Sequence, residues 1–299
     1  MKHKLRLVVA SVLVPVLAMA QWPESHAEDA SAAPLQGSLD PGYSLWLSQV
    51  EDSDFDGNGE SSMLKFESTW AAAYFGQGFF GGDVSVDFFL NSTFPLSSTS
   101  LKLPDQLIQL AMDLELLWRY ENGSVFQVDL EPGYYFDMED FSFDGIFFPF
   151  SLAVAIPLNP DLAGVIGSHV RPGFERGFLP ILGVDWSISE AVDLQLQMPE
   201  SRLTWYAAER WIFTLGFEWI SESYALEKNG GLDRKMLTFE SIDMEAGVVF
   251  RLNDEMRLAL VYGESTEREV EFEKTGMMLP RVSDIDDGQY LKLGLLGPL

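Results

Sequence analysis

The chain has 299 residues, a formal net charge of −27 and no cysteine. So large an excess of acid excludes binding to nucleic acid or to anionic headgroups through a basic surface. Without cysteine the fold has no disulfide bonds, so burial and hydrogen bonding must hold it together. Aromatic residues make up 13% of the chain, a large share for so acidic a protein. This composition favours a folded protein that attracts cations.

Residues 1–20 have the features of a secretory signal peptide. Basic residues precede an apolar run over 7–17, and small residues follow it, as in a signal that is cleaved after Ala20 or, as the alternative, after Ala27. The run is too short to serve as a permanent membrane anchor. Cleavage would take the net charge from −27 to −30, because three basic residues and no acid are lost. We expect an exported chain that begins with a flexible periplasmic lead-in over 21–37.

The clearest structural signal is a hairpin over 112–136, whose two arms flank the turn 121–124. The turn contains an Asn-Gly pair, which is a strong hairpin signal. Large apolar side chains alternate with charged ones along both arms. Because successive side chains of a strand point to opposite faces, one face of the hairpin is apolar and the other carries carboxylates.

The same alternation recurs along the chain and predicts fourteen strands. In order they cover 43–47, 64–74, 84–90, 112–120, 126–136, 146–158, 162–169, 182–188, 192–198, 203–205, 211–219, 242–250, 256–262 and 291–295. The apolar run 146–158 could form a core helix, but its alternation of large and small residues and its internal Pro149 favour a strand. The hairpin around Pro199 has arms shorter than the roughly 9–11 residues of a spanning strand, so the count falls to twelve if it does not span. The charged segment 264–274 would extend its strand beyond the membrane.

The connections between these strands alternate in length. Short ones lie at 76–82, 121–124, 157–161, 189–191, 208–210 and 253–255. Longer ones lie at 51–61, 92–106, 137–145, 171–178, 223–236 and 273–287, and the connection at 199–202 is an exception. Short turns on one rim and long loops on the other are typical of bacterial outer-membrane barrels, whose short turns face the periplasm.

Lipid offers no hydrogen-bond partners to the backbone, so a sheet can span a membrane only if it closes on itself. We therefore predict an all-β fold over 38–299, an antiparallel up-and-down transmembrane barrel of 12–14 strands, with a soluble sandwich as the alternative. Aromatic residues near the strand ends are expected to form two girdles at the membrane interfaces. These are Trp118, Tyr120, Trp186, Trp211 and Phe250 beside the short turns, and Tyr134 and Trp219 toward the long loops.

One segment also carries a resemblance. Residues 194–205 have a Pro-x-x-Arg corner, and the aromatic-ended arms of a hairpin follow through 209–211 to 216–219. In this pattern the chain resembles a bacterial outer-membrane β-barrel family over about residues 38–299. The resemblance implies a barrel located in the bacterial outer membrane and implies no particular activity.

The charged faces of the strands predict the lining of the lumen. The expected lining residues are Asp87, Asp113, Glu115, Arg119, Asp129, Glu131, Asp185, Asp193, Glu218, Asp243, Glu245, Arg251, Arg257 and Lys292, with Lys65 as a further basic partner. Barrels of this size leave a lumen unless a loop plugs it, and rings of carboxylates tune the ion selectivity of pores. We expect a passive, porin-like channel that favours cations. The alternative is an interior ion-pair network that fills a narrow barrel.

An acidic loop offers a second function. Asp52, Asp54 and Asp56 alternate before a glycine, as in the first half of a calcium-binding loop, but Met63 occupies the twelfth position, where such loops carry a bidentate Glu. A flexible acidic loop is the simpler interpretation. If the loop does bind calcium, the only cofactor considered, the protein would be a structural or surface-interaction barrel that holds divalent ions.

A lipid-modifying enzyme is the least favoured alternative. Its base would be His169, but the adjacent Ser168 falls on the opposite face of the same strand, and Ser187 is a candidate nucleophile only if the fold brings it close. We therefore expect no catalytic residues. The expected partners are outer-membrane lipid, the barrel-assembly machinery and small solutes or ions, and no nucleic acid.

Overall fold

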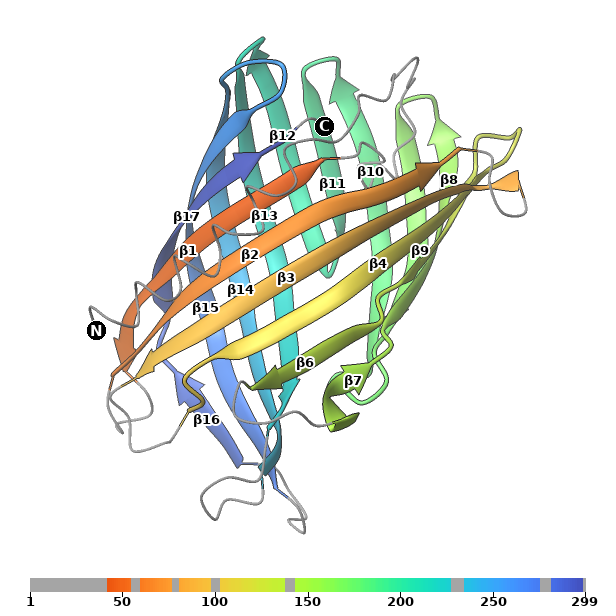
Figure 1. The fold of residues 1–299 in the computed structure, drawn as a ribbon. Helices are drawn as coiled ribbons and strands as arrows, with labels where there is room; N and C mark the ends of the chain where they lie inside the picture. Colours follow the sequence, from red (N-terminus) through yellow and green to blue (C-terminus); the bar gives the residue numbers. More distant parts are fainter. Residues whose placement is uncertain are drawn as a thin grey trace. The chain divides into compact units, whose positions relative to one another are not determined.

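The computed structural model describes residues 42–54, 60–76, 81–97, 103–137, 143–226, 234–274 and 281–297. These residues form one closed sheet (Figure 1). The predicted signal peptide and lead-in lie outside the described residues. Within the described part of the chain, no helix is long and apolar enough to cross a membrane.

The sheet consists of seventeen segments that run in chain order. They are β1 (Tyr43–Asp54), β2 (Glu60–Phe75), β3 (Asp83–Ser97), β4 (Leu107–Arg119), β5 (Val125–Leu130), β6 (Gly133–Asp137), β7 (Ile146–Phe147), β8 (Phe150–Asn159), β9 (Leu162–Val170), β10 (Phe178–Ser189), β11 (Val192–Met198), β12 (Glu200–Ala208), β13 (Trp211–Ala225), β14 (Arg234–Arg251), β15 (Arg257–Lys274), β16 (Arg281–Ile285) and β17 (Gly288–Leu296).

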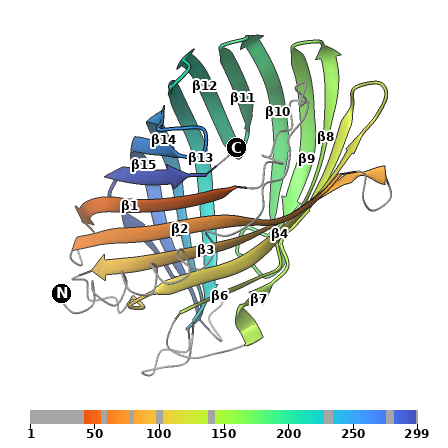
Figure 2. The ribbon, with the colours of Figure 1, turned by 45° about the horizontal axis from the view of Figure 1, so that its top comes forward.

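The seventeen segments make fourteen strands, because three strands of the wall are each broken in two. These are β5 with β6, β7 with β8, and β16 with β17. Each strand pairs antiparallel with the next, and β17 returns to β1, from Ser44 opposite Leu296 to Val50 opposite Tyr290. Figure 2 shows the strands around the barrel, with β8 to β12 facing β1 to β4. The prediction of a closed barrel of 12–14 strands is confirmed.

Several details differ from the sequence prediction. The strand β3 extends to Ser97, within the predicted connection 92–106, and β16 lies within the predicted connection 273–287. The single strand predicted over 146–158 is interrupted at Phe148 and Pro149, so β7 pairs with β6 while β8 pairs with β5. The connection placed at 199–202 is shorter than expected, since Pro199 alone separates β11 from β12. These two strands belong to the wall, and their short arms are a feature of the barrel itself.

The outer face of the barrel is apolar. Large hydrophobic side chains are exposed on it along most of the strands, among them Leu110, Leu152, Ile166, Leu182, Leu196, Leu215, Leu260 and Leu293. Tyr120, Trp186 and Trp211 lie at the short-turn ends of this face, and Trp211 packs against Phe250 with ring centroids 4.6 Å apart. At the other end, Tyr134 stacks on a neighbouring ring. An apolar exterior on a closed sheet is the architecture of a transmembrane barrel of the bacterial outer membrane.

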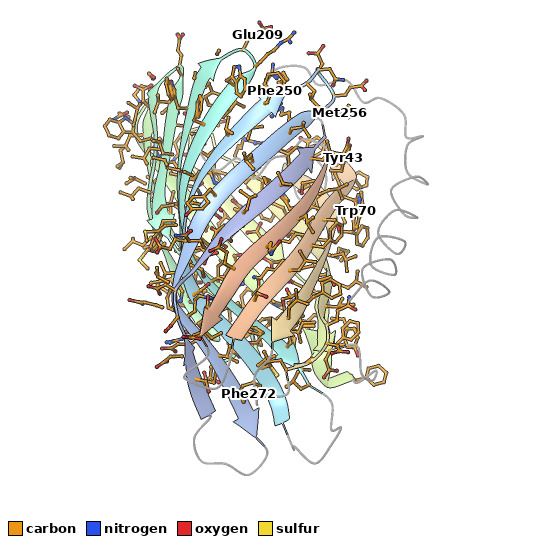
Figure 3. The ribbon with its side chains drawn as sticks, turned by 90° about the vertical axis from the view of Figure 1, so that its left-hand side faces the viewer. Tyr43, Trp70, Glu209, Phe250, Met256 and Phe272 are labelled. Carbon is orange, nitrogen blue, oxygen red and sulfur yellow. The ribbon has the colours of Figure 1, made fainter. Side chains whose placement is uncertain are left out.

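The short turns gather at one end of the barrel. Figure 3 places Tyr43, Trp70, Glu209, Phe250 and Met256 toward this end and Phe272 toward the opposite, long-loop end. Several of the turns are fixed by Asn side chains that accept backbone N–H groups two residues further on, as Asn122 does from Ser124 and Asn159 from Asp161. These are Asx turns, in which the side chain takes the place of a backbone partner.

The interior at the long-loop end is filled by a cluster of apolar side chains, which we call the apolar core. Its buried members are Val50, Met63, Leu107, Tyr135, Phe147, Tyr224, Leu237, Val270, Phe272, Ile285 and Tyr290. Leu107 and Leu237 come from strands on different sides of the barrel, and both are 0% exposed. Opposite walls also meet directly here, since Ala225 of β13 pairs with Phe136 of β6 in a parallel bridge. The barrel is therefore closed at this end by packed side chains.

The orientation of the two faces can be tested on adjacent residues of β11. Leu196 is 56% exposed on the outer face, whereas Gln195 points inward opposite Asp185 and Arg202. We expect Leu196→Arg to lower the free energy of unfolding by about 2–4 kcal/mol, the cost of a charge near the middle of the lipid. Gln195→Arg should cost much less. Denaturant unfolding in lipid vesicles measures both, and equal losses would contradict the assignment of the faces.

Candidate functional site: the barrel interior

One wall of the interior carries half of the predicted acidic lining residues. Asp87 of β3 lies directly opposite Asp113 of β4, and Glu115 lies opposite Asp129 of β5. The side-chain amide of Gln127 donates to both of the latter carboxylates, at 3.0 Å to Glu115 and 2.9 Å to Asp129. One oxygen of Asp113 is buried without a hydrogen-bond partner among the described residues.

Glu131 completes this group, because its carboxylate lies within electrostatic range of Asp113 and Asp129. The five carboxylates, Asp87, Asp113, Glu115, Asp129 and Glu131, are called the acidic wall below. Alternation predicted that they share the inner face, and pairing in register brings them side by side. Among the described residues, no group of three or more acidic or histidine side chains has the arrangement of a metal site.

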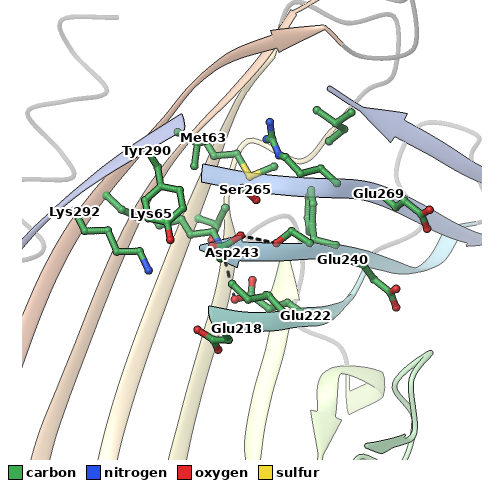
Figure 4. A pocket seen from close by; sticks show the side chains of 18 of the residues that line it. Met63, Lys65, Glu218, Glu222, Glu240, Asp243, Ser265, Glu269, Tyr290 and Lys292 are labelled. Atoms are coloured by element: carbon green, nitrogen blue, oxygen red, sulfur yellow. Dashed lines mark hydrogen bonds and ion pairs between the residues drawn. The ribbon is translucent and has the colours of Figure 1, made fainter. Parts of the chain in front are cut away.

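A second polar group surrounds a cavity of about 120 Å³ that is lined from β1 to β3, β13 to β15 and β17 (Figure 4). Here the acids have basic partners. Lys65 lies 3.6 Å from Glu222, and Lys292 lies 3.1 Å from Glu245. Tyr290 donates its hydroxyl to the same Glu245 at 3.2 Å. These contacts join three different parts of the chain around one space.

The lining of this cavity is nevertheless acidic on balance. Its carboxylates are Glu67, Glu218, Glu222, Glu240, Asp243 and Glu269, and its basic residues are Lys65, Arg268 and Lys292. Arg268 donates to the Ser53 hydroxyl at 2.8 Å and to the Asp286 carbonyl at 3.0 Å. Asp243 accepts a hydrogen bond of 3.0 Å from Ser241. The cavity thus offers carboxylate oxygens to a cationic or polar guest.

The remaining predicted lining residues lie apart from both groups. Arg119 forms an ion pair with Asp83 near the short turns. Asp185 is buried and accepts a hydrogen bond from Gln197. Asp193 lies in β11 and interacts with Tyr206. The other two, Arg251 and Arg257, pair with each other at the short-turn ends of β14 and β15.

The predicted calcium site lies mostly outside the described residues. Asp56 and the side chain of Asp52 are not among them, while Asp54 is exposed at the end of β1. His169 lies inward on β9 between Ser151 and Leu179, and its Nε2 is buried without a hydrogen-bond partner among the described residues.

The possible nucleophiles do not reach His169. Ser168 occupies the opposite face of the strand, and Ser187 lies at the far end of β10, opposite Asp193. The Ser151 hydroxyl, which lies next to His169 in register, donates to Asp129 instead. The arrangement therefore lacks the serine–histidine hydrogen bond that nucleophilic catalysis requires.

Sequence reasoning predicted a connection at 171–178 but missed the contacts that its residues 171–177, the turn between β9 and β10, make with other strands. Arg171 of this turn is 7% exposed and donates to the backbone carbonyl of Ser221, in the middle of β13. Arg176 forms two hydrogen bonds with Glu240, at 2.9 and 3.1 Å, which raise the pKa of the guanidinium above its ordinary value. Its guanidinium also lies over the Trp219 ring, 5.6 Å from the centroid. No alternation pattern marks such contacts, since they join strands that are distant in sequence.

No protein-family model and no curated protein matches the chain. Among solved structures, an outer-membrane channel from Pseudomonas putida F1 is similar with a TM-score of 0.45 and 12% identity, over 92% of this chain and 99% of that one. The NanC porin gives a TM-score of 0.39 and 8% identity, over 85% and 100%. The transport unit of the autotransporter AIDA-I from Escherichia coli gives 0.37 and 9%, over 90% and 93%. The likeness concerns the barrel architecture alone.

The apolar core can be tested by truncating one of its side chains. Because Leu237 is fully buried, Leu237→Ala should leave a cavity and lower the free energy of unfolding by about 2–5 kcal/mol. The control is Leu293→Ala on the outer face, where Leu293 is 53% exposed and lipid chains refill the space. Unfolding in vesicles measures both variants. Losses of equal size would indicate a water-filled interior at the long-loop end.

Proposed function

We propose that this barrel is a gated outer-membrane channel whose acidic interior favours cations and cationic polar solutes. The observation that carries the proposal is the acidic wall, where five carboxylates lie together on adjacent inward-facing positions of three neighbouring strands. Carboxylates that line a pore attract cations and repel anions. Lys65 and Lys292 form their ion pairs with Glu222 and Glu245 beside the cavity, and neither pair includes any of these five carboxylates.

The distribution of charge supports transport rather than simple filling. An ion-pair network that only filled the barrel would place acids and bases in comparable numbers. Here the acidic wall and the cavity lining are both acidic on balance. A low-dielectric wall around a set of like charges focuses the field and raises the local concentration of counter-ions.

The apolar core supports a closed resting state. Hydrophobic constrictions gate pores by excluding water, and ions do not cross packed apolar side chains. Tyr224 and Leu237, which are 1% and 0% exposed, are packed within this core. Conduction therefore requires a rearrangement at the long-loop end.

The same core favours a second candidate, a barrel that conducts nothing. Such a protein would be a structural or surface-interaction barrel, and its acidic loop, with Asp52, Asp54 and Asp56, would hold divalent ions such as calcium between the barrel and its surroundings. The two candidates differ in conductance, which only the channel has.

Ion selectivity tests the channel directly. In planar bilayers under a salt gradient, the wild-type protein should give a reversal potential of the sign that marks cation selectivity. Asp113→Asn with Glu115→Gln and Asp129→Asn should move it toward zero, because three charges leave the acidic wall. The matched control is Glu190→Gln with Glu209→Gln and Glu255→Gln, which removes three exposed charges from the short turns.

Two results would count against this function. A reversal potential that shifts as much in the control as in the acidic-wall variant would place the selectivity at the rim instead of the wall. Complete absence of conductance, in the wild type and in Leu237→Ala with its loosened core, would leave the structural barrel as the better assignment.

A further inference from the structure

The hydrogen-bonded wall of the barrel is interrupted between β10 and β13. The β11–β12 hairpin that separates these strands ends at Pro199, whose carbonyl accepts the backbone N–H of Trp219 at 3.0 Å. Beyond that point, residues 178–181 of β10 pair with β9 alone, and residues 220–224 of β13 pair with β14 alone. In Figure 1 the hairpin stops well before β13 does.

This interruption is a window with four sides. The hairpin lies at its edge toward the short turns, β10 and β13 form its flanks, and the bridge between Phe136 of β6 and Ala225 of β13 closes it at the long-loop end. A backbone N–H or C=O group that is buried without a hydrogen-bond partner costs free energy. Something must therefore satisfy the edge of β13, and the turn 171–177 does so by placing Arg171 on the carbonyl of Ser221.

The turn fits this window closely. Phe174 packs between Tyr135 and Phe147 of the apolar core, with ring centroids 5.2 and 4.9 Å away. Gly173 has a φ of 89°, and a Cβ there would come within 2.7 Å of the Phe147 ring, so the backbone itself lies against the core. Arg171 stacks over Phe174 at 5.2 Å, and its Nη2 is buried without a partner among the described residues.

The window adjoins the polar cavity. Glu240 borders the cavity on β14, but its side chain points away from Asp243 and Lys65 in Figure 4, and its carboxylate binds Arg176 of the turn. Ile220 and Glu222, on the inner face of the β13 segment that borders the window, line the cavity as well. The turn and its contacts with Glu240 and Ser221 therefore lie beside the wall segment whose inner face lines the cavity.

The side chains on the outer face of the strands beside the window indicate whether it opens to hydrocarbon or to water. Along β13 the outward positions change from apolar, at Phe213 and Leu215, to polar, at Ser221 and Ser223. Glu240, opposite Ser221 on β14, is charged. The window thus lies beyond the apolar band, on the long-loop side of Trp219. A solute that passed through it would enter from water or the headgroup region rather than from hydrocarbon.

We propose that the turn 171–177 is a side gate, through which cations or cationic polar solutes reach the cavity while the apolar core keeps the long-loop end closed. The gate rests on the proposed channel function. Arg176, Glu240 and Trp219 form its latch, which lies at the surface. Arg171 and Phe174 form its inner seal. Opening breaks the latch and withdraws Phe174 from between two rings, without disturbing the strands of the barrel.

The experiment compares a variant that breaks the Arg176–Glu240 ion pair with one in which these two positions are covalently joined. Arg176→Gln should raise the open probability in planar bilayers by about 1.5- to 5-fold, the equivalent of one surface ion pair. The control is Arg202→Gln, which removes an ion pair of 2.9 Å with Glu200 on the inner face of β12, outside the turn and its contacts. The chain has no cysteine, so Arg176→Cys with Glu240→Cys can be joined by a short bis-maleimide. Joining them should abolish most of the current.

A second measurement does not depend on conduction. Ser241 lines the cavity, and Ser241→Cys should react faster with a small charged thiosulfonate when Arg176→Gln is also present, and no faster with Arg202→Gln. Current that persists after cross-linking, together with unchanged thiol reactivity, would overturn the gate and leave the channel standing. Absence of current from every variant would overturn the channel and, with it, the gate.

Discussion

Every backbone N–H and C=O group that faces hydrocarbon must find its partner within the protein, and this requirement shapes the whole structure. Fourteen strands meet it by pairing on both sides, and the ladder between β1 and β17 removes the last free edges. Where the short β11–β12 hairpin leaves β13 without a neighbouring strand, a guanidinium takes the place of that strand. Arg171 donates to the carbonyl of Ser221 as a backbone N–H would.

A closed barrel of this size creates an interior that side chains must either fill or leave to water. This protein does both. At the long-loop end, rings and branched side chains from opposite walls pack into the apolar core, which behaves like the core of a soluble domain. Further toward the short turns, many of the inward side chains are carboxylates. Some of them form ion pairs with Lys65 and Lys292, and others form hydrogen bonds alone. The interior is therefore apolar at the long-loop end and acidic toward the short turns.

Much of this architecture follows from alternation in the sequence. The period of two identifies which side chains face lipid, and it correctly predicts the closed sheet and the position of most strands. It does not indicate which inward side chains of distant strands lie at the same level along the barrel axis and come into contact. Leu107, Tyr224 and Leu237 lay outside the predicted strands, although the structure places them on β4, β13 and β14, where together they close one end of the barrel. The break at Pro149 also escaped it, because the local pattern is unchanged across Phe148 and Pro149 while the pairing partner changes.

The window between β10 and β13 results from the unequal lengths of neighbouring strands and not from the alternation of side chains. Seven residues in β11 and nine in β12 stand beside the fifteen of β13, so part of β13 must extend past its neighbour. A sheet edge left in this way can be covered by another strand, which would fix it in place, or by a turn, which is easier to displace. A turn held by one exposed ion pair and one aromatic wedge costs less to open than the ladder of backbone hydrogen bonds that a strand would bring. The shortness of the hairpin, which first suggested strands outside the wall, instead marks the place where the wall is easiest to open.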